Sequence, residues 1–124
     1  MCKKYRIGID AGGTKVAYGL FDADGQLLDR MQHPSDINAD GPAFSDRMIE
    51  TIREIEKKHN LKNEDLQGIG ICMPSYILFD TGYVYLTSAL TNIRDFPMKE
   101  YLQERLPGVK IVLDNDSNAA ALAE

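Results

Sequence analysis

The stretch IGIDAGGTK, residues 7–15, joins one apolar strand to a second strand through a double-glycine turn. Its chemistry-bearing residues are Asp10, Gly12, Gly13, Thr14 and Lys15. A carboxylate that ends a strand can hold Mg²⁺ through water, and paired glycines let main-chain N–H groups approach an anion closely. With a hydroxyl and a lysine beside them, these groups suit the phosphates of a nucleotide. The stretch is neither a P-loop nor a dinucleotide fingerprint, because it has no GKS or GKT ending and no GxGxxG spacing.

A plain hairpin turn is the alternative, since a Gly-Gly pair between two apolar runs is also typical of a tight connection between strands. The turn by itself does not distinguish a phosphate-binding loop from a plain hairpin. The motifs in the rest of the chain favour the phosphate-binding loop.

Composition narrows the class of protein. The 124 residues are enough for one domain with a sizeable core, and 44% hydrophobic and 27% charged residues are ordinary for a globular protein. The net charge is −5 with no basic run, so we expect no nucleic-acid partner. No apolar stretch approaches the roughly 18 residues that span a bilayer, so we expect no membrane partner.

Cysteine usage and the first residues favour a cytoplasmic protein. Cys2 and Cys72 lie far apart with no metal-ligand spacing, and we interpret both as reduced thiols, with Cys72 in the core. The start lacks the apolar segment of a signal peptide. His33 and His59 belong to no group of chemically related residues, and we expect them at the surface.

The first half predicts three strands and a helix. Apolar, β-rich runs at residues 5–10, 16–21 and 26–33 form a meander, with the turn DADG before the third run. Asp40 is a plausible N-cap, and one apolar face follows at helical spacing: Phe44, Met48, Ile52 and Ile55. The charged residues off that face should be solvated: Glu54, Glu56, Lys57 and Lys58.

The second half predicts crossover units. The expected elements are a buried strand at Leu66–Cys72, a short extended piece at Tyr83–Thr87, a helix over 98–106, a buried strand over 109–113 and an alanine-rich helix from Ala119 onward. The order β-β-β-α-β-α-β-α, with the short piece before the second helix, predicts an α/β fold with one mixed sheet and helices on both faces. No linker interrupts it, so residues 1–124 form one unit.

A second polar cluster, DNDSN at residues 114–118, follows a buried strand and precedes a helix. Ligands of open α/β sheets bind beyond the carboxyl ends of strands, so the Asp10 and Asp116 loops would face one cleft if their strands lie side by side. Asp116 could accept a proton from an attacking hydroxyl, and Asn115 could hold neighbouring hydroxyls. Helix capping is the alternative for each residue, above all for Asp114.

Three motifs in this order resemble the ROK family of sugar kinases and transcriptional repressors. GIDAGGTK at 8–15 is similar to the family's first phosphate motif. GIGI at 68–71, with Pro74 and Gly82, resembles its second signature, and 114–124 resembles its NDANAAALGE stretch. The likeness covers essentially all 124 residues.

The resemblance implies an actin-like ATPase fold of the ribonuclease-H-like type and transfer of phosphate from ATP to a sugar. It implies these roles: Asp10 for Mg²⁺, Gly12, Gly13, Thr14 and Lys15 for phosphate, Asp116 as catalytic base and sugar ligand, Asn115 as sugar ligand. Residues 1–124 would be the N-terminal lobe. The family's second lobe carries the zinc motif and the adenosine pocket, so the chain alone should be poorly active, and a homodimer is implied.

Two differences from the family's sequence pattern affect the expected sugar specificity. The family's sugar-contacting Asn-Leu pair is replaced by Ala89-Leu90 after Ser88, and its Pro-Gly pair is Pro74-Ser75. Glucose specificity is therefore not implied, and another hexose, an amino sugar or a β-glucoside stays open.

Other functions remain to be weighed against the kinase. The sugar-sensing domain of a ROK-type regulator would bind a sugar without transferring phosphate, but the intact phosphate motif favours the kinase. An actin-like ATPase or an acyl-group kinase would not require Asn115 and Asp116. A purely structural α/β module leaves both polar clusters unexplained.

Overall fold

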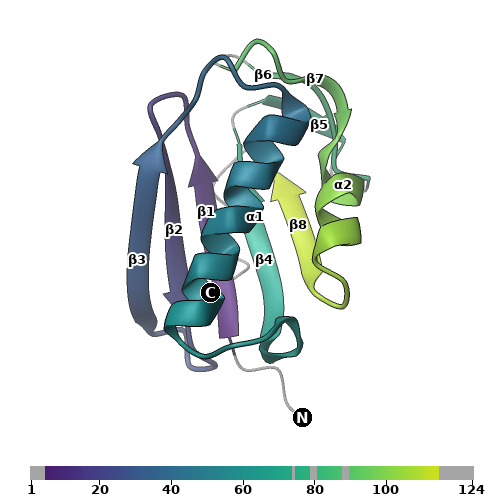
Figure 1. Cartoon of the computed structure of the whole chain (residues 1–124). Helices are drawn as coiled ribbons and strands as arrows, with labels where there is room; N and C mark the ends of the chain where they lie inside the picture. The colour runs from purple at the N-terminus through teal and green to yellow at the C-terminus, as the bar shows by residue number, and fades with distance from the viewer. Residues whose placement is uncertain (1–4, 74, 79–80, 88–89, 115–124) are drawn as a thin grey trace.

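The computed structural model describes residues 5–73, 75–78, 81–87 and 90–114. Its body is a five-stranded sheet in the order β3-β2-β1-β4-β8, with the helices α1 and α2 packed on it (Figure 1). The strands are β1 Tyr5–Ala11, β2 Lys15–Phe21, β3 Leu27–Pro34, β4 Leu66–Cys72 and β8 Lys110–Asp114. The five strands predicted for this sheet are confirmed, each end to within one residue.

The sheet is mixed, as expected. β1, β2 and β3 form an antiparallel meander, whereas β1, β4 and β8 run parallel. Parallel neighbours require crossover connections, which α1 and α2 supply. The carboxyl ends of β1, β4 and β8 therefore meet at one edge of the sheet, at the top of Figure 1.

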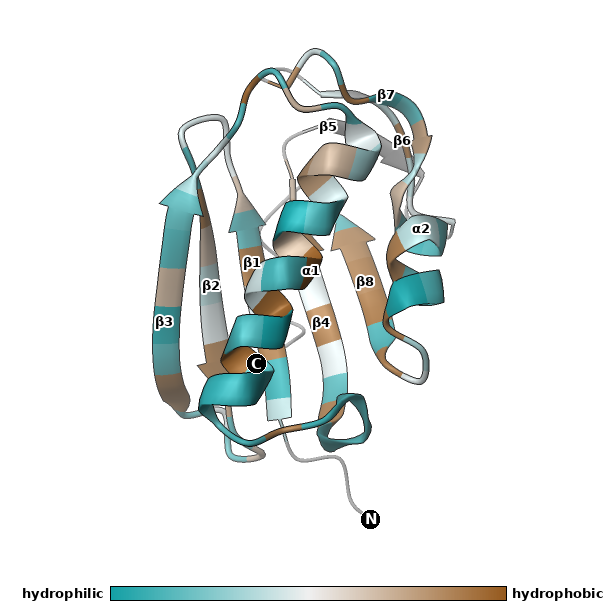
Figure 2. Cartoon of the chain, viewed as in Figure 1, coloured by the Kyte–Doolittle hydropathy of each residue, from teal (hydrophilic) through white to brown (hydrophobic). Residues whose placement is uncertain are grey.

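The helix α1 spans Gly41–Lys58, and its N-cap is the predicted Asp40, whose side chain accepts a hydrogen bond from the amide of Ala43 at 3.0 Å. All four predicted apolar positions are buried against the sheet: Phe44, Met48, Ile52 and Ile55. Figure 2 shows hydrophobic colour on the parts of α1 that face the sheet and along β8, while the outward turns of α1 and most of β3 are hydrophilic. The apolar residues that recur with the helical period of 3.6 thus identify the side of α1 that packs on the sheet, as expected.

The helix α2 spans Met98–Arg105 and packs against α1 and β8, so both described helices cover the same face of the sheet. Both crossovers run in the same direction across the sheet, and a right-handed crossover then puts its helix on the same side each time. The alanine-rich helix expected from residue 119 lies outside the described residues. Helical cover of the second face therefore stays a prediction.

A second, smaller sheet is the main difference from the expected fold. It is antiparallel, in the order β5-β6-β7, and lies at the end of the large sheet where the parallel strands finish. Its strands are β5 Ser75–Leu78, β6 Tyr83–Thr87 and β7 Arg94–Pro97. The prediction of a single sheet was wrong: β6 coincides with the short extended piece predicted at Tyr83–Thr87, but β5 and β7, of four residues each, are too short to show a clear period. A short 3-10 turn, η1 at Asn63–Asp65, precedes β4.

Two polar residues expected at the surface are buried. His33 is 9% exposed, and Glu56 on α1 is 5% exposed and pairs with Arg53 at 2.8 Å. Cys72 lies in the core, as predicted, at 8% exposure. None of the described helices is both long and apolar enough to cross a bilayer.

Candidate functional site

The β1–β2 turn holds the first group of predicted site residues. The amide of Gly12 donates to the carbonyl of Lys15 at 3.0 Å, which closes the hairpin. A Cβ atom at Gly12 would lie 3.3 Å from that carbonyl oxygen, closer than most Cβ contacts, so the turn favours glycine there. The turn is thus a hairpin connection and a candidate anion loop at once, and the two interpretations of the sequence are compatible.

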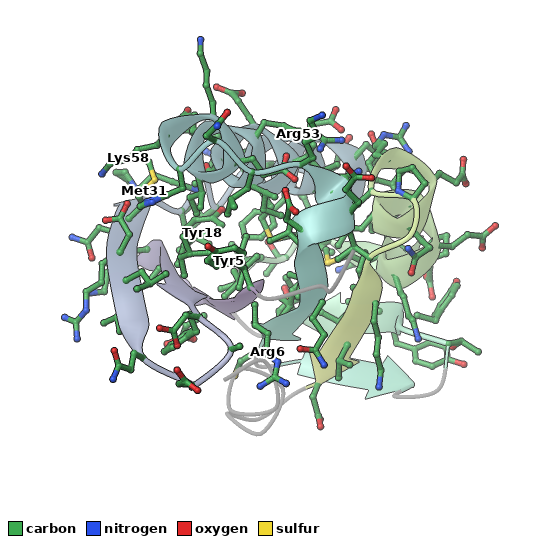
Figure 3. The ribbon with its side chains drawn as sticks, turned by 90° about the horizontal axis from the view of Figure 1, so that it is seen from below. Tyr5, Arg6, Tyr18, Met31, Arg53 and Lys58 are labelled. Carbon is green, nitrogen blue, oxygen red and sulfur yellow. The ribbon has the colours of Figure 1, made fainter. Side chains whose placement is uncertain are left out.

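Strand alternation sets the direction of the two charged side chains. Ile9 and Ala11 of β1 are buried toward α1, so the intervening Asp10 points to the opposite face, where it is exposed. In the view along the strands, Tyr18 lies on the helix side of the sheet and Arg6 on the other side (Figure 3). Lys15 is likewise exposed at the start of β2.

Asp10 and Lys15 line one cavity of about 490 Å³ on the face of the sheet that α1 does not cover. Three small residues of β1 and β2 line the same cavity: Gly8, Ala17 and Gly19. Arg30 of β3 adds a second positive charge to the lining. The cavity therefore has the charges of an anion site with one carboxylate beside it.

The second predicted group lies beyond β8. In the parallel ladder, Asp10 of β1 is in register with Cys72 of β4, and Cys72 is in register with Asp114 of β8. The amide of Met73 donates to the carbonyl of Asp114 at 2.9 Å, which ties the two strand ends together. The β1 and β8 ends thus share one edge, but the two strands are not side by side, because β4 lies between them.

Asp10, Cys72 and Asp114 form a row across three parallel strands, and the distance between its two ends follows from sheet geometry. Neighbouring strands lie about 4.8 Å apart, so the backbones of Asp10 and Asp114 are separated by about 10 Å. Asn115 and Asp116, the predicted sugar ligand and base, directly follow Asp114 and lie outside the described residues, as do Pro74, Ser88 and Ala89.

The residues present fit Mg²⁺ only together with a phosphate. No group of three or more His, Cys, Asp or Glu residues within the described ranges could hold a metal ion. Mg²⁺ usually binds proteins through one or two carboxylates, keeps several waters and takes its other ligands from phosphate oxygens. A single exposed carboxylate, Asp10, beside a glycine turn and a lysine is compatible with that mode of binding.

A buried polar pair joins β2 to β3, and no motif or period of the sequence indicates it. The Oη atom of Tyr18 is 2.8 Å from Nε2 of His33, and Nδ1 of His33 is 2.9 Å from the carbonyl oxygen of Pro34. A carbonyl can only accept, so Nδ1 carries a proton and donates, and in the neutral ring Nε2 accepts from the tyrosine. Burial raises the pKa of Tyr18 to about 12, which keeps its hydroxyl protonated and able to donate.

Known proteins place the chain in a family. The sequence pattern of the ROK family matches residues 6–124, and the chain belongs to the ROK family. A glucokinase from Halalkalibacterium halodurans is 32% identical over 128 residues, which cover 100% of this chain and 37% of that protein. The chain therefore spans little more than a third of the length of this relative.

Solved structures confirm the fold. A ROK family glucokinase from Streptomyces griseus, in complex with glucose and AMPPNP, is 27% identical with a TM-score of 0.71, and the match covers 94% of this chain and 35% of that chain. A ROK family transcriptional regulator, a homolog of the E. coli MLC protein, has a TM-score of 0.76 at 16% identity over 90% of this chain and 28% of its own. The second likeness shows the fold alone. The expected actin-like ATPase fold is confirmed.

Proposed function

We propose that this chain is the phosphate- and sugar-binding lobe of an ATP-dependent sugar kinase, which transfers the γ-phosphoryl group of ATP to a hydroxyl of a hexose. The observation that carries the proposal is the row of Asp10, Cys72 and Asp114 across three parallel strands. It brings the candidate phosphate loop and the strand that leads into Asn115 and Asp116 to one edge of the sheet. Ligands of open α/β sheets bind at such an edge.

The β1–β2 turn would bind the phosphates. The main-chain N–H of Gly13 and the hydroxyl of Thr14 would donate hydrogen bonds, and Lys15 would supply a positive charge, while the N–H of Gly12 closes the hairpin. Asp10 would hold Mg²⁺ through water, and the ion would supply positive charge beside the phosphates. Because these groups are set in place by the hairpin, they need little rearrangement when phosphate binds.

The loop after β8 would bind the sugar. Asn115 holds sugar hydroxyls through its amide, which is donor and acceptor together. Asp116 accepts the proton of the attacking hydroxyl, a role that typically contributes ~10² to 10⁴ in rate. The ends of β1 and β8 lie about 10 Å apart from the strand spacing, which would leave room for a sugar and a terminal phosphate.

The chain spans 37% of its glucokinase relative, so we propose that the remaining part of the protein completes the site with the surface for adenosine. A cytoplasmic homodimer is part of the same proposal, by family likeness. The departures at Pro74-Ser75 and Ala89 leave the sugar open: a hexose other than glucose, an amino sugar or a β-glucoside.

A sugar-sensing domain of a ROK-type regulator is the second candidate, because the chain also shares its fold with a ROK transcriptional regulator. A sensor must bind the sugar, but its function does not require binding of Mg²⁺ or of the γ-phosphate. The exposed Asp10 and Lys15 on either side of an ordered glycine turn favour the kinase.

A coupled assay of ADP release on the complete protein separates the two candidates. The protein is supplied with MgATP and one sugar at a time from a panel of hexoses, amino sugars and β-glucosides, and sugar binding is measured in parallel by calorimetry. We expect ADP release with at least one sugar that also binds. Tight binding of a sugar without ADP release would contradict the kinase and support the sensor.

A further inference from the structure

Ser35, the first residue after β3, connects this strand to the candidate phosphate loop. Its Oγ atom donates a hydrogen bond of 2.6 Å to the carbonyl oxygen of Gly12, and its amide donates one of 3.0 Å to the carbonyl oxygen of Thr14. One residue thus binds two of the peptide groups of the β1–β2 turn. The side chain of Ser35 is half-buried, so water competes only partly for these contacts.

These two bonds determine what the turn presents to an anion. Carbonyl oxygens carry partial negative charge and repel phosphate, whereas amide N–H groups attract it. The peptide bond is planar and trans, so the N–H of Gly13 points opposite to the carbonyl of Gly12. When Ser35 binds that carbonyl, the N–H of Gly13 is directed away from Ser35 and left available for another acceptor.

The segment before Ser35 is itself fixed. Nδ1 of His33 donates to the carbonyl of Pro34, and the hydroxyl of Tyr18 donates to Nε2 of the same ring, inside the layer between the sheet and α1. In the β2–β3 ladder, Pro34 is in register with Lys15. The end of β3 is therefore held by buried contacts on the side opposite to the exposed Lys15, and Ser35 has little freedom to leave the turn.

We propose that Ser35 is a positioning residue for nucleotide phosphate: it keeps the carbonyls of Gly12 and Thr14 engaged, so that the turn presents N–H groups to the anion. The proposal rests on the proposed function, because it requires that the turn binds phosphate. Ser35 itself would make no contact with phosphate. Its effect should fall on the nucleotide and not on the sugar.

The test uses Ser35→Ala in the complete protein, with Ser35→Thr as the conservative variant that keeps the hydroxyl. Ser45→Ala is the matched control, because the Ser45 hydroxyl is fully buried in α1 and has no hydrogen-bond partner among the described residues. The readouts are the Kd of AMPPNP with Mg²⁺ by calorimetry, the KM values for ATP and for the sugar, and the melting temperature.

We expect Ser35→Ala to raise the Kd of AMPPNP and the KM for ATP by roughly three- to tenfold, the size typical of one lost hydrogen bond. The KM for the sugar should stay within about twofold of wild type, since β8, which leads into Asn115 and Asp116, is two strands away from β1. Ser35→Thr should recover most of the nucleotide affinity, and Ser45→Ala should match wild type.

Two results would overturn the inference, and they are distinguishable from failure of the proposed function. If wild type binds AMPPNP and Ser35→Ala binds it equally well, Ser35 does not position the loop. If Ser35→Ala loses sugar and nucleotide affinity together with several degrees of melting temperature, its role is general stability. If wild type binds no nucleotide at all, the phosphate site fails and the positioning role fails with it.

Discussion

Asp29 joins the edge strand β3 to the C-terminal end of α1. Its Oδ2 atom lies 2.8 Å from Nε2 of His59 and 3.0 Å from Nζ of Lys58. The hydrogen bond from His59, followed by that from Lys58, lowers the pKa of Asp29 from 3.8 to about 2. The folded protein thus favours the ionised carboxylate more strongly than the unfolded chain does.

The sign of the pH dependence follows from this shift. A lowered pKa in the folded state contributes stability above pH 3.8, and this contribution is lost as the pH falls toward about 2. We expect Asp29→Asn to lower the free energy of unfolding at pH 6 and to flatten its decline between pH 4 and pH 2. Chemical denaturation over that range is the measurement. Asp24→Asn, on the exposed β2–β3 turn, is the control, and an equal flattening there would contradict the assignment.

Local sequence patterns do not predict the burial or the long-range contacts of several single residues. His33 and Glu56 looked like surface residues, yet both are buried. Tyr18, fifteen residues away in sequence, binds the ring of His33, and Arg53, one helical turn before Glu56, binds one of its two carboxylate oxygens. Ser35 and Gly12 are 23 residues apart, and no local period or motif connects them. By contrast, the N-cap at Asp40 could be predicted, since a cap depends only on the next three residues.

At the scale of elements, α1 meets the small sheet at one close contact. A Cβ atom added to Gly41, the first residue of α1, would collide with the ring of Phe96 in β7. Phe96 in turn packs against Tyr101 of α2, with the ring centroids 5.3 Å apart. The start of α1, the strand β7 and the helix α2 are therefore packed together around one aromatic ring.

We expect Gly41→Ala to destabilise the protein by about 1–3 kcal/mol, the usual cost of overpacking. In a Phe96→Ala background the ring is gone, and the same change should become neutral or stabilising by up to about 1 kcal/mol, since alanine favours helix more than glycine does. A double-mutant cycle by chemical denaturation measures the coupling. Additive effects of the two changes would show that the ring and the helix start do not interact.

The large sheet and both helices could be predicted because their signals are local. Buried strands such as Leu66–Cys72 are apolar runs bounded by turns, and α1 repeats its apolar residues over eighteen positions. The small sheet could not be predicted in the same way. β7 has only four residues and ends in a proline, which argues against a strand when only the sequence is considered. Its Asp95 also has a φ of 50°, which is unusual in a strand and which no sequence pattern indicates.

For the whole molecule, the sequence pointed to the edge of the sheet but not to the order of its strands. Two polar clusters after strands predicted a common edge, and the register of β1, β4 and β8 supplies it. That β4 lies between the clusters is a property of the topology, which no motif encodes. The roles of Asp10, Gly12, Gly13, Thr14, Lys15, Asn115 and Asp116 stay predictions that rest on this edge and on the family likeness.

The most direct test of a kinase with Asp116 as its base is Asp116→Asn in the complete protein, assayed with the sugar that wild type turns over best. We predict that kcat falls by ~10² to 10⁴, the contribution typical of a general base, while the Kd of the sugar by calorimetry changes only severalfold. Asp24→Asn, in the β2–β3 turn at the opposite end of the sheet from the carboxyl ends of β1, β4 and β8, should match wild type. A wild-type kcat in Asp116→Asn would contradict the central claim.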